Sequence, residues 1–270
     1  MRYLQSGEFY GETNQTIELD NIVLTDTEYT HKKVDWHYHE NAYFTFILQG
    51  QIIEGNKKEV YTCSAGSLLF HNWQEPHYNI KPDVFTRGFH VELEGDWFKN
   101  LAFDIAALQG SLNISNPDVK FLFYKIFKET KGLDDVASLS IQDLLLQVFG
   151  KMTAHNTSKT YKNPPQWVAK IKAILHDEFY KTFSLENLAQ SVEIHPVHLS
   201  RDFPKHFHCT LGEYIRKLRV EKSLHLLPNK ALSITEIAYK CGFADQSHLN
   251  RCFKNAMQTT PLAYKKLLHG

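Results

Sequence analysis

The chain has 270 residues, of which 43% are hydrophobic and 22% charged, a composition that excludes a disordered protein and is long enough for two hydrophobic cores. Its 30 basic side chains balance 30 acidic ones, so net charge alone does not indicate a polyanionic partner. No apolar stretch has the length of a membrane span or the layout of a signal peptide. Four scattered cysteines lack paired metal-site spacing, and we expect a protein of the reducing cytoplasm with no membrane partner.

The first part of the chain has the pattern of short strands. Residues 17–95 contain alternating or apolar runs such as AYFTFILQG and EVYTCSAGSLLF. These runs are punctuated by Gly50, Gly55, Gly66 and Gly88. Short strands with frequent turns predict a β-barrel or jelly roll.

Two histidine motifs lie within this region. WHYHENAYFTFILQG contains His37 and His39, and SAGSLLFHNWQEPHY contains Pro76 and His77 near its end. Together they resemble the paired motifs of the cupin fold, in which two His, a carboxylate and a further His hold a metal ion. The carboxylate position falls here near Tyr43 and Phe44, and Glu40 would point to the opposite face of a strand from His39. We therefore expect no metal ion and no cofactor, although His37, His39 and His77 are the candidate ligands.

We favour instead a pocket for a small organic effector. The histidines would form its polar lining, and nearby aromatic side chains would form apolar walls. The alternative for the histidines is a cap at the barrel mouth, and for each aromatic residue a place in the core. The candidate effector contacts are Trp36, His37, His39, Tyr43, Phe46, Trp73 and His77, with Phe70 and Tyr78 as further wall residues.

Helices are predicted after the strands, over 96–105, 116–131 and 138–152. The last two have apolar faces too broad for a single surface stripe. Packing on the barrel explains part of this width, and a dimer seam would explain the rest. Residues 155–165, HNTSKTYKNPP, are polar, end in two prolines and have the composition of a linker.

The charges divide at this linker. Residues 163–270 contain 15 basic and 9 acidic side chains, a net charge of +6, whereas residues 1–162 contain 15 and 21, a net charge of −6. The attraction for phosphate groups is therefore concentrated in the C-terminal part.

That part contains a helix-turn-helix pattern. ALSITEIAYK begins with a capping box of Ser233 and Glu236, Gly242 terminates the helix, and Asp245 caps a second helix starting at about 245. In CGFADQSHLNRCFK, Leu249 and Phe253 form the inward stripe, and polar side chains occupy the other face. Taken alone, an ordinary helical hairpin would fit equally well.

The pattern occurs twice. Residues 184–207 begin with Ser184 and contain LSRDF, which aligns with LNRCF fifty residues later. Between the copies, 210–227 form a long amphipathic helix that ends at Pro228. Such a connector could hold two recognition helices about one DNA turn apart, roughly 34 Å.

Residues from about 165 to 268 resemble the DNA-binding domain of the AraC/XylS family of bacterial transcription regulators. The resemblance rests on the second-motif signature, carried here by Ala238, Gly242, Phe243, Asp245, Ser247, Leu249, Arg251, Phe253, Lys254, Thr260, Pro261 and Tyr264. The chain departs from the family at Gln258 and His208, where Gly is usual, at His195, where Ser is usual, and at Lys265, where Arg is usual. These departures affect the turns and the cap of the first recognition helix.

The resemblance implies an α+β protein of two domains. Residues 1–154 would form a cupin-like domain that binds an effector and forms a homodimer, 155–165 a linker, and 166–270 an all-α domain with two helix-turn-helix motifs. The expected function is a transcription factor that binds double-stranded DNA and responds to a small molecule. The residues expected to face DNA are Val197, His198, Ser200, Arg201, Lys205, Gln246, Ser247, Asn250, Arg251 and Lys254.

Two alternatives of other classes stay open at this point. The first is a metal-dependent cupin enzyme fused to a DNA-binding domain, against which the missing carboxylate argues. The second is a ligand-independent activator whose N-terminal domain serves only for dimerisation or for contact with RNA polymerase. We expect no catalytic residues and no enzyme activity.

Overall fold

The computed structural model describes residues 1–100, 108, 110–157 and 164–269. The chain divides into two compact units, Met1–Val148 and Phe149–Gly270. In the described part of the chain, no helix is long and apolar enough to cross a membrane. The limits expected at 154 and 166 stay a prediction, because 158–163 lie outside the described residues.

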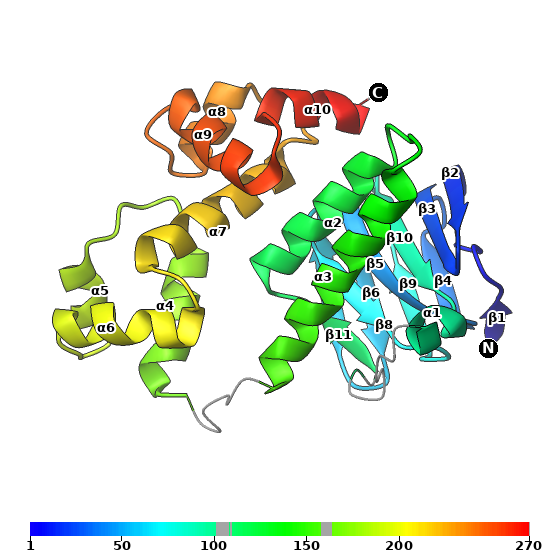
Figure 1. The fold of residues 1–270 in the computed structure, drawn as a ribbon, viewed down its shortest axis with the longest axis horizontal. Helices are drawn as coiled ribbons and strands as arrows, with labels where there is room; N and C mark the ends of the chain where they lie inside the picture. Colours follow the sequence, from blue (N-terminus) through cyan, green and yellow to red (C-terminus); the bar gives the residue numbers. More distant parts are fainter. Residues whose placement is uncertain (101–107, 109, 158–163, 270) are drawn as a thin grey trace. The chain divides into compact units, whose positions relative to one another are not determined.

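The first unit is built on two sheets (Figure 1). In the five-stranded sheet the order is β1 (Arg2–Leu4), β4 (Lys33–His39), β9 (His77–Ile80), β6 (Gln51–Asn56) and β7 (Val60–Ser64). In the six-stranded sheet it is β11 (Ser111–Asn113), β8 (Leu68–His71), β5 (Ala42–Gln49), β10 (Arg87–Leu93), β3 (Ile22–Glu28) and β2 (Glu12–Leu19). Apart from the neighbouring pairs β6–β7 and β2–β3, adjacent strands in each sheet come from distant parts of the chain, so both sheets depend on non-local pairing.

Helices cover one face of the six-stranded sheet. The unit contains α1 (Gly95–Asn100), α2 (Pro117–Glu129) and the start of α3 (Ala137–Thr157). Because side chains alternate along a strand, Phe44 and Phe46 of β5 point to the same face, where they pack against Phe123 and Tyr124 of α2 with ring centroids 4.7 and 4.5 Å apart. The residues that alternate with them along β5 therefore point to the opposite face of the sheet.

The expected β-sheet domain followed by helices is confirmed at this level. The helices predicted over 116–131 and 138–152 correspond to α2 and α3. The helix predicted over 96–105 corresponds to α1 as far as Asn100, and residues 101–105 lie outside the described residues.

The second unit is helical. It contains α4 (Gln166–Asp177), α5 (Leu185–Ser191), α6 (Pro196–Phe207), α7 (Leu211–Leu226), α8 (Ile234–Lys240), α9 (Gln246–Met257) and α10 (Pro261–His269). One hydrophobic core joins α4 to the first helix pair and to α7, and contains Ile171, Leu175, Leu188, Ala189, Val192, Leu199, Phe203, Tyr214 and Leu218. The predicted inward residues of the second pair, Leu249 and Phe253, are fully buried.

The predicted helix signals are confirmed in atomic detail. Ser233 and Glu236 form the capping box of α8, and Oδ1 of Asp245 accepts a 2.7 Å hydrogen bond from the amide of His248. His195, at the position where the family uses Ser, caps α6 by accepting the amide hydrogen of Val197 on its Nδ1 at 3.3 Å. Lys265, at the position of a family Arg, donates to the carbonyl oxygens of Asn229 and Leu232 and so holds the start of the second motif.

The two helix pairs differ by one residue in the turn. The caps of α5 and α8, Ser184 and Ser233, are 49 residues apart, whereas His195 and Asp245, which cap α6 and α9, are 50 apart. The first turn places Glu193 at φ 59°, and the second places Gly242 at φ 79°. The repeat is therefore 49 residues up to the turn and 50 after it.

The C-termini of both recognition helices carry strain that glycine would relieve. His208 ends α6 at φ 57° and Gln258 ends α9 at φ 55°, in the left-handed region that costs a side-chain-bearing residue about 1–2 kcal/mol. We expect His208→Gly and Gln258→Gly each to raise the free energy of unfolding by about 0.5–1 kcal/mol, since the greater freedom of glycine in the unfolded chain offsets part of the gain. Urea unfolding of the full chain measures this effect.

The matched control is Lys240→Gly, within the helical backbone of α8. It should lower the free energy of unfolding by about 1 kcal/mol. A loss of stability in His208→Gly and Gln258→Gly as well would contradict the assignment of backbone strain.

Candidate functional site

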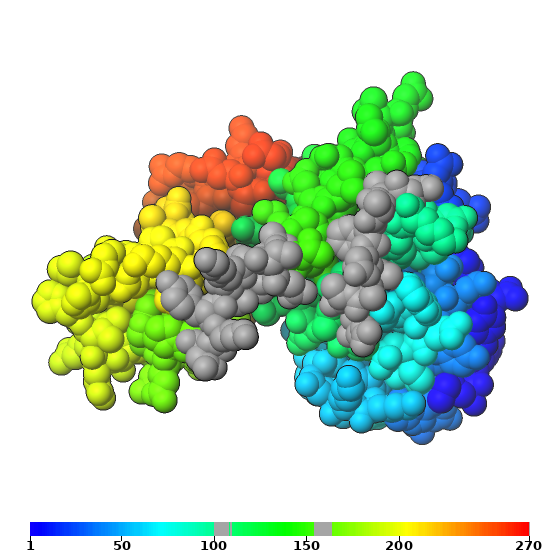
Figure 2. Space-filling view, turned by 60° about the horizontal axis from the view of Figure 1, so that its bottom comes forward, coloured from blue at the N-terminus to red at the C-terminus, as the bar shows by residue number. Residues whose placement is uncertain are grey.

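Two helices of the second unit present polar faces to solvent. Among the ten residues expected to face DNA, all but Asn250 are exposed, and Asn250 is half-buried. They lie on α6 and α9, each the second helix of its pair, and α5 and α6 form an outer surface of the unit (Figure 2, yellow). Burial of Leu199, Phe203, Leu249 and Phe253 on the opposite sides fixes both helices in this orientation.

The face of α6 is partly neutralised by its own carboxylate. Asp202 accepts two hydrogen bonds of 3.1 Å from Arg201 and one of 2.7 Å from Lys205. Arg201 also donates to Nδ1 of His198 at 3.1 Å. These contacts lower the pKa of Asp202 and raise that of Arg201, so the ion pair is formed near neutral pH.

The face of α9 has a different electrostatic character. Arg251, at the position equivalent to Arg201, forms no hydrogen bond or ion pair with any residue that the structure describes. The acidic side chain of Glu236 on α8 is engaged in the capping box with Ser233. Oε1 of Gln246 accepts a 2.7 Å hydrogen bond from the hydroxyl of Thr235, which leaves the amide hydrogens of Gln246 available as donors.

The two pairs are joined by α7, which packs against α6, α8 and α9. Arg219 on α7 donates to the carbonyl oxygens of Phe179 and Lys181 at 2.9 and 2.7 Å. The loop between α4 and α5 is thereby held on both sides of Tyr180. The connector thus positions both motifs and the loop beside them.

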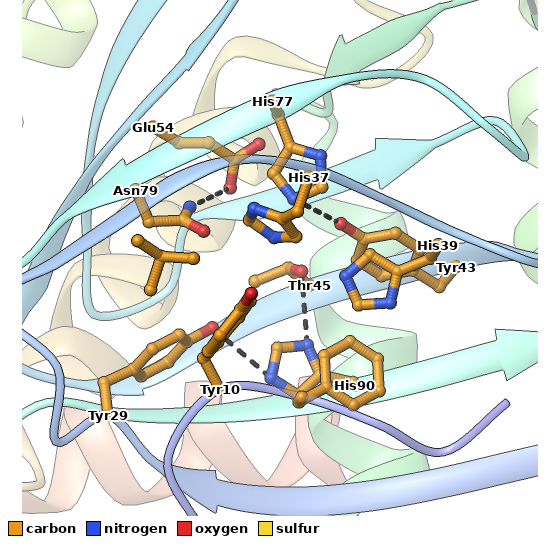
Figure 3. Close-up of a pocket in the computed structure, with 12 residues that line it drawn as sticks. Tyr10, Tyr29, His37, His39, Tyr43, Thr45, Glu54, His77, Asn79 and His90 are labelled. Atoms are coloured by element: carbon orange, nitrogen blue, oxygen red, sulfur yellow. Dashed lines mark hydrogen bonds between the residues drawn. The ribbon is translucent and has the colours of Figure 1, made fainter. Parts of the chain in front are cut away.

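The first unit contains a pocket lined by histidine and tyrosine side chains (Figure 3). Strand alternation directs residues from five strands into it: β4, β5, β6, β9 and β10. The segment before β2 adds Phe9, whose ring stacks on that of His90 with centroids 3.8 Å apart, and Tyr10. The twelve lining residues are Phe9, Tyr10, Tyr29, Val34, His37, His39, Tyr43, Thr45, Glu54, His77, Asn79 and His90.

Hydrogen bonds fix the orientation of two of these histidines. The Nδ1–H of His37 donates to the carbonyl oxygen of Asp35 at 2.9 Å, and the Nδ1–H of His77 donates to that of Glu75 at 3.2 Å. The lone pair of each neutral ring therefore lies on Nε2. Nε2 of His77 accepts a 2.9 Å hydrogen bond from the hydroxyl of Tyr43 (Figure 3).

A buried carboxylate lies in the same pocket. Oε1 of Glu54 is 3.0 Å from Nε2 of His71, and Asn79 donates to Oε2 of Glu54 at 3.3 Å. Burial alone would raise the pKa of Glu54, but the charge and hydrogen bond of His71, with His77 and His37 nearby, lower it to about 2. Glu54 is therefore an anion at neutral pH, and the described lining contains no Lys or Arg.

Residues 188–267 match the family model described as a helix-turn-helix domain. The Msm operon regulatory protein of Streptococcus mutans is 25% identical over 273 residues, covering 92% of this chain and 95% of that protein. The HTH-type transcriptional activator RhaS of Salmonella paratyphi B is 28% identical over 244 residues, covering 83% of this chain and 85% of that protein. Among solved structures, ToxT from Vibrio cholerae O395 gives a TM-score of 0.39 at 16% identity, covering 93% of this chain and 99% of that one.

The helix-turn-helix match covers both helix pairs almost completely, and the regulators resemble the chain over most of its length. The chain is an AraC-family transcriptional regulator. It is a DNA-binding regulator, and the relatives named above are regulators, not enzymes.

The pocket of this AraC-family regulator differs from the expected one. Of the seven candidate effector contacts, His37, His39, Tyr43 and His77 line it. Trp36 is 38% exposed and contacts the ring of Tyr78 edge-on, and Trp73 is 46% exposed, so neither forms a wall of the pocket. Phe46 is three residues from Tyr43 on β5, so alternation turns it away from the pocket toward α2.

Sequence reasoning missed several lining residues of the regulator. Glu54 and His90 come from strands outside the two histidine motifs, Tyr29 follows the end of β3, and Asn79 lies on β9 just past the second motif. The alternating pattern of the strand around His90 could have indicated this residue, which pairs with Thr45 across β10 and β5. Nothing local marks Glu54, because its proximity to His77 depends on the pairing of β6 with β9.

Burial of His90 predicts that the regulator loses stability in mild acid. Burial, helped by the charge of His71, lowers the pKa of His90 to about 3, whereas an unfolded histidine titrates near 6.5. The unfolded chain therefore binds more protons between these values, so stability is complete above about pH 6.5 and falls as the pH drops toward 3. We expect lower urea midpoints at about pH 5.5 than at about pH 7.5, and a smaller difference in His90→Gln.

The exposed His31 provides the control for this experiment. His31→Gln should retain the full pH dependence. An equal dependence in His90→Gln and the unmodified protein would contradict the assignment to His90.

Proposed function

We propose that the regulator reads an operator with α6 and α9 in successive major grooves on one face of the duplex. This proposal rests on the exposed polar faces of the two helices. Buried residues fix the orientation of each helix, and α7 connects the two helix pairs. With 16 residues α7 spans about 24 Å, a length compatible with placing two recognition helices about one DNA turn apart. Lysine and arginine side chains would contact phosphates, while Arg251, Asn250 and Gln246 supply the donors best suited to base edges.

The N-terminal unit is proposed as the effector sensor. Its two sheets would form a cupin-like jelly roll around the pocket at His37, His39, Tyr43 and His77. The anionic Glu54 and the lack of lysine or arginine in the described lining disfavour an anionic effector. A small uncharged or cationic effector fits this lining better, through hydrogen bonds to imidazole, hydroxyl and amide groups. The regulator would act in the cytoplasm, and as an activator, the role that the name of RhaS states for that relative.

We propose that α3 provides a homodimer contact. Packing on the sheet accounts for the apolar side chains of α2, but Leu139 and Leu146 of α3 are 70% and 44% exposed. They lie one heptad apart and so share one face of the helix. Light scattering after gel filtration should give a dimer mass for the full chain and a monomer mass for Leu139→Lys/Leu146→Lys. The exposed Gln147→Lys on the same helix serves as the control, and equal masses for the two variants would exclude this contact.

Selection of genomic fragments by the purified full chain tests the DNA proposal. It is done at a fixed, stated salt concentration, with and without extracts that contain candidate effectors. Two half-elements about one helical turn apart would support reading by both helices. Salt-sensitive binding without an enriched motif would show that the polar faces do not read bases. Thermal-shift screening then tests the sensor, because an effector stabilises the folded state by mass action.

A further inference from the structure

The donor atoms of three buried histidines converge in the pocket of the first unit. One ring nitrogen from each of His37, His39 and His77 lies within 4.8 Å of the others. His37 and His77 face each other across the β4–β9 pair, and His39 extends the same face of β4 (Figure 3). All three side chains are at least 97% buried. We propose that these imidazoles bind a divalent transition-metal ion, such as Zn²⁺, Ni²⁺ or Cu²⁺.

The surroundings of the rings support ligation. A metal-bound histidine ordinarily donates its second ring N–H to a carbonyl or carboxylate, which fixes the tautomer and orients the ring. His37 and His77 both do so, each toward the backbone oxygen two residues earlier. Nδ1 of His39 is buried and makes no hydrogen bond to any described residue. A buried polar atom without a partner is rare and costly, and a metal ion would satisfy it.

The chemistry of the donor set selects the class of ion. Three neutral imidazoles suit zinc, nickel and copper, whereas Mg²⁺ and Ca²⁺ require oxygen ligands. Burial keeps these rings neutral, with the pKa of His77 lowered to about 3 and that of His39 well below its usual value. The nearby carboxylate of Glu54 would balance part of the charge of the ion. This carboxylate comes from β6, outside the histidine motifs, and not from the position at Tyr43 where a cupin carries it.

Tyr43 competes with the ion. Its hydroxyl donates to Nε2 of His77, the nitrogen whose lone pair would ligate the metal. Two nitrogens bound to one zinc ion at about 2.0–2.1 Å are no more than ~4.2 Å apart, so ligation draws the rings together and turns the hydroxyl away. Loss of this hydroxyl should therefore strengthen metal binding. If the pocket had only a structural role, loss of this hydroxyl would not strengthen metal binding.

Metal titration of the full chain, in the absence of DNA, tests the proposal. Protein dialysed against EDTA and then against buffer is titrated with Zn²⁺ and Ni²⁺ in competition with a chromophoric chelator. We expect one site per chain. His39→Ala should weaken it by at least about 100-fold, because loss of an outer hydrogen-bond partner alone costs 10–100-fold. Tyr43→Phe should tighten it by roughly two- to tenfold, the equivalent of one hydrogen bond.

The exposed His31 again provides the control, and His31→Ala should leave the affinity unchanged. Absence of a site, or equal affinity in His39→Ala and the unmodified protein, would overturn the proposal and assign any binding to surface histidines. If circular dichroism shows that His39→Ala does not fold, Tyr43→Phe decides: tighter binding supports the site, and unchanged or weaker binding overturns it. Operator binding is measured separately, so failure of the metal site leaves the DNA-binding proposal intact.

Discussion

Replacement of Gly242 by Ala is expected to destabilise the second helix-turn-helix motif by about 3 kcal/mol or more and to abolish operator binding at physiological temperature. Gly242 lies at φ 79°, where a side chain costs about 1–2 kcal/mol. A Cβ atom built there would also lie 2.5 Å from the carbonyl oxygen of Tyr180 and 2.7 Å from its Cα. Both atoms belong to the backbone, and Arg219 holds that backbone through the carbonyl oxygens of Phe179 and Lys181. The clash therefore cannot be relieved by rotation of a side chain.

The equivalent residue of the first turn supplies a matched control. Glu193 has φ 59° but already carries a side chain, which is exposed. Glu193→Ala should change the free energy of unfolding by less than about 0.5 kcal/mol. Urea unfolding and operator affinity of both variants measure the contrast. Near-native stability of Gly242→Ala would show that the loop at Tyr180 can move away.

Replacement of Arg251 by Ala is expected to weaken operator binding by about 1–3 kcal/mol, or roughly 5- to 150-fold in Kd. Arg251 is exposed on α9 and has no hydrogen bond or ion pair among the residues that the structure describes, so its guanidinium is available to DNA. Loss of discrimination at one base position would assign it to a base edge. A salt slope reduced by about 1 with unchanged specificity would assign it to a phosphate.

Arg201→Ala is the matched variant on α6. Arg201 is bound to Asp202 and His198, and DNA must compete with these contacts. We therefore expect a smaller loss of affinity than in Arg251→Ala. Fluorescence anisotropy with one operator at several salt concentrations compares the two. If neither variant alters affinity or salt slope, these arginines do not contact DNA.

The helix-turn-helix pairs of this regulator could be predicted from local sequence rules. Helix ends depend on contacts within a few residues, so Ser233 with Glu236, Asp245 and Gly242 could each be assigned a position from local rules. The repeat of LSRDF as LNRCF then showed two copies, and the positions of Leu249 and Phe253 separated the buried side from the polar one. The one-residue difference between the turns did not affect these assignments.

The full lining of the pocket could not be predicted in this way, because it depends on how the strands pair. His37, His39, Tyr43 and His77 were expected there, because two of them are alternate residues of one strand and the motifs resemble known ones. Phe46 was misplaced, since strand alternation relative to Tyr43 turns it away from the pocket, and the same alternation relative to His37 turns Trp36 outward.

The charge of the pocket could not be predicted from local sequence rules. Glu54 reaches His71 and Asn79 only because β6 pairs with β9 and the two sheets bring β8 close to them. Helix signals act between neighbours in the chain, and they can be found in the sequence. Contacts between strands far apart in the chain depend on the register of the whole sheet, and the electrostatics that would select an effector or a metal ion arise only when that register is formed.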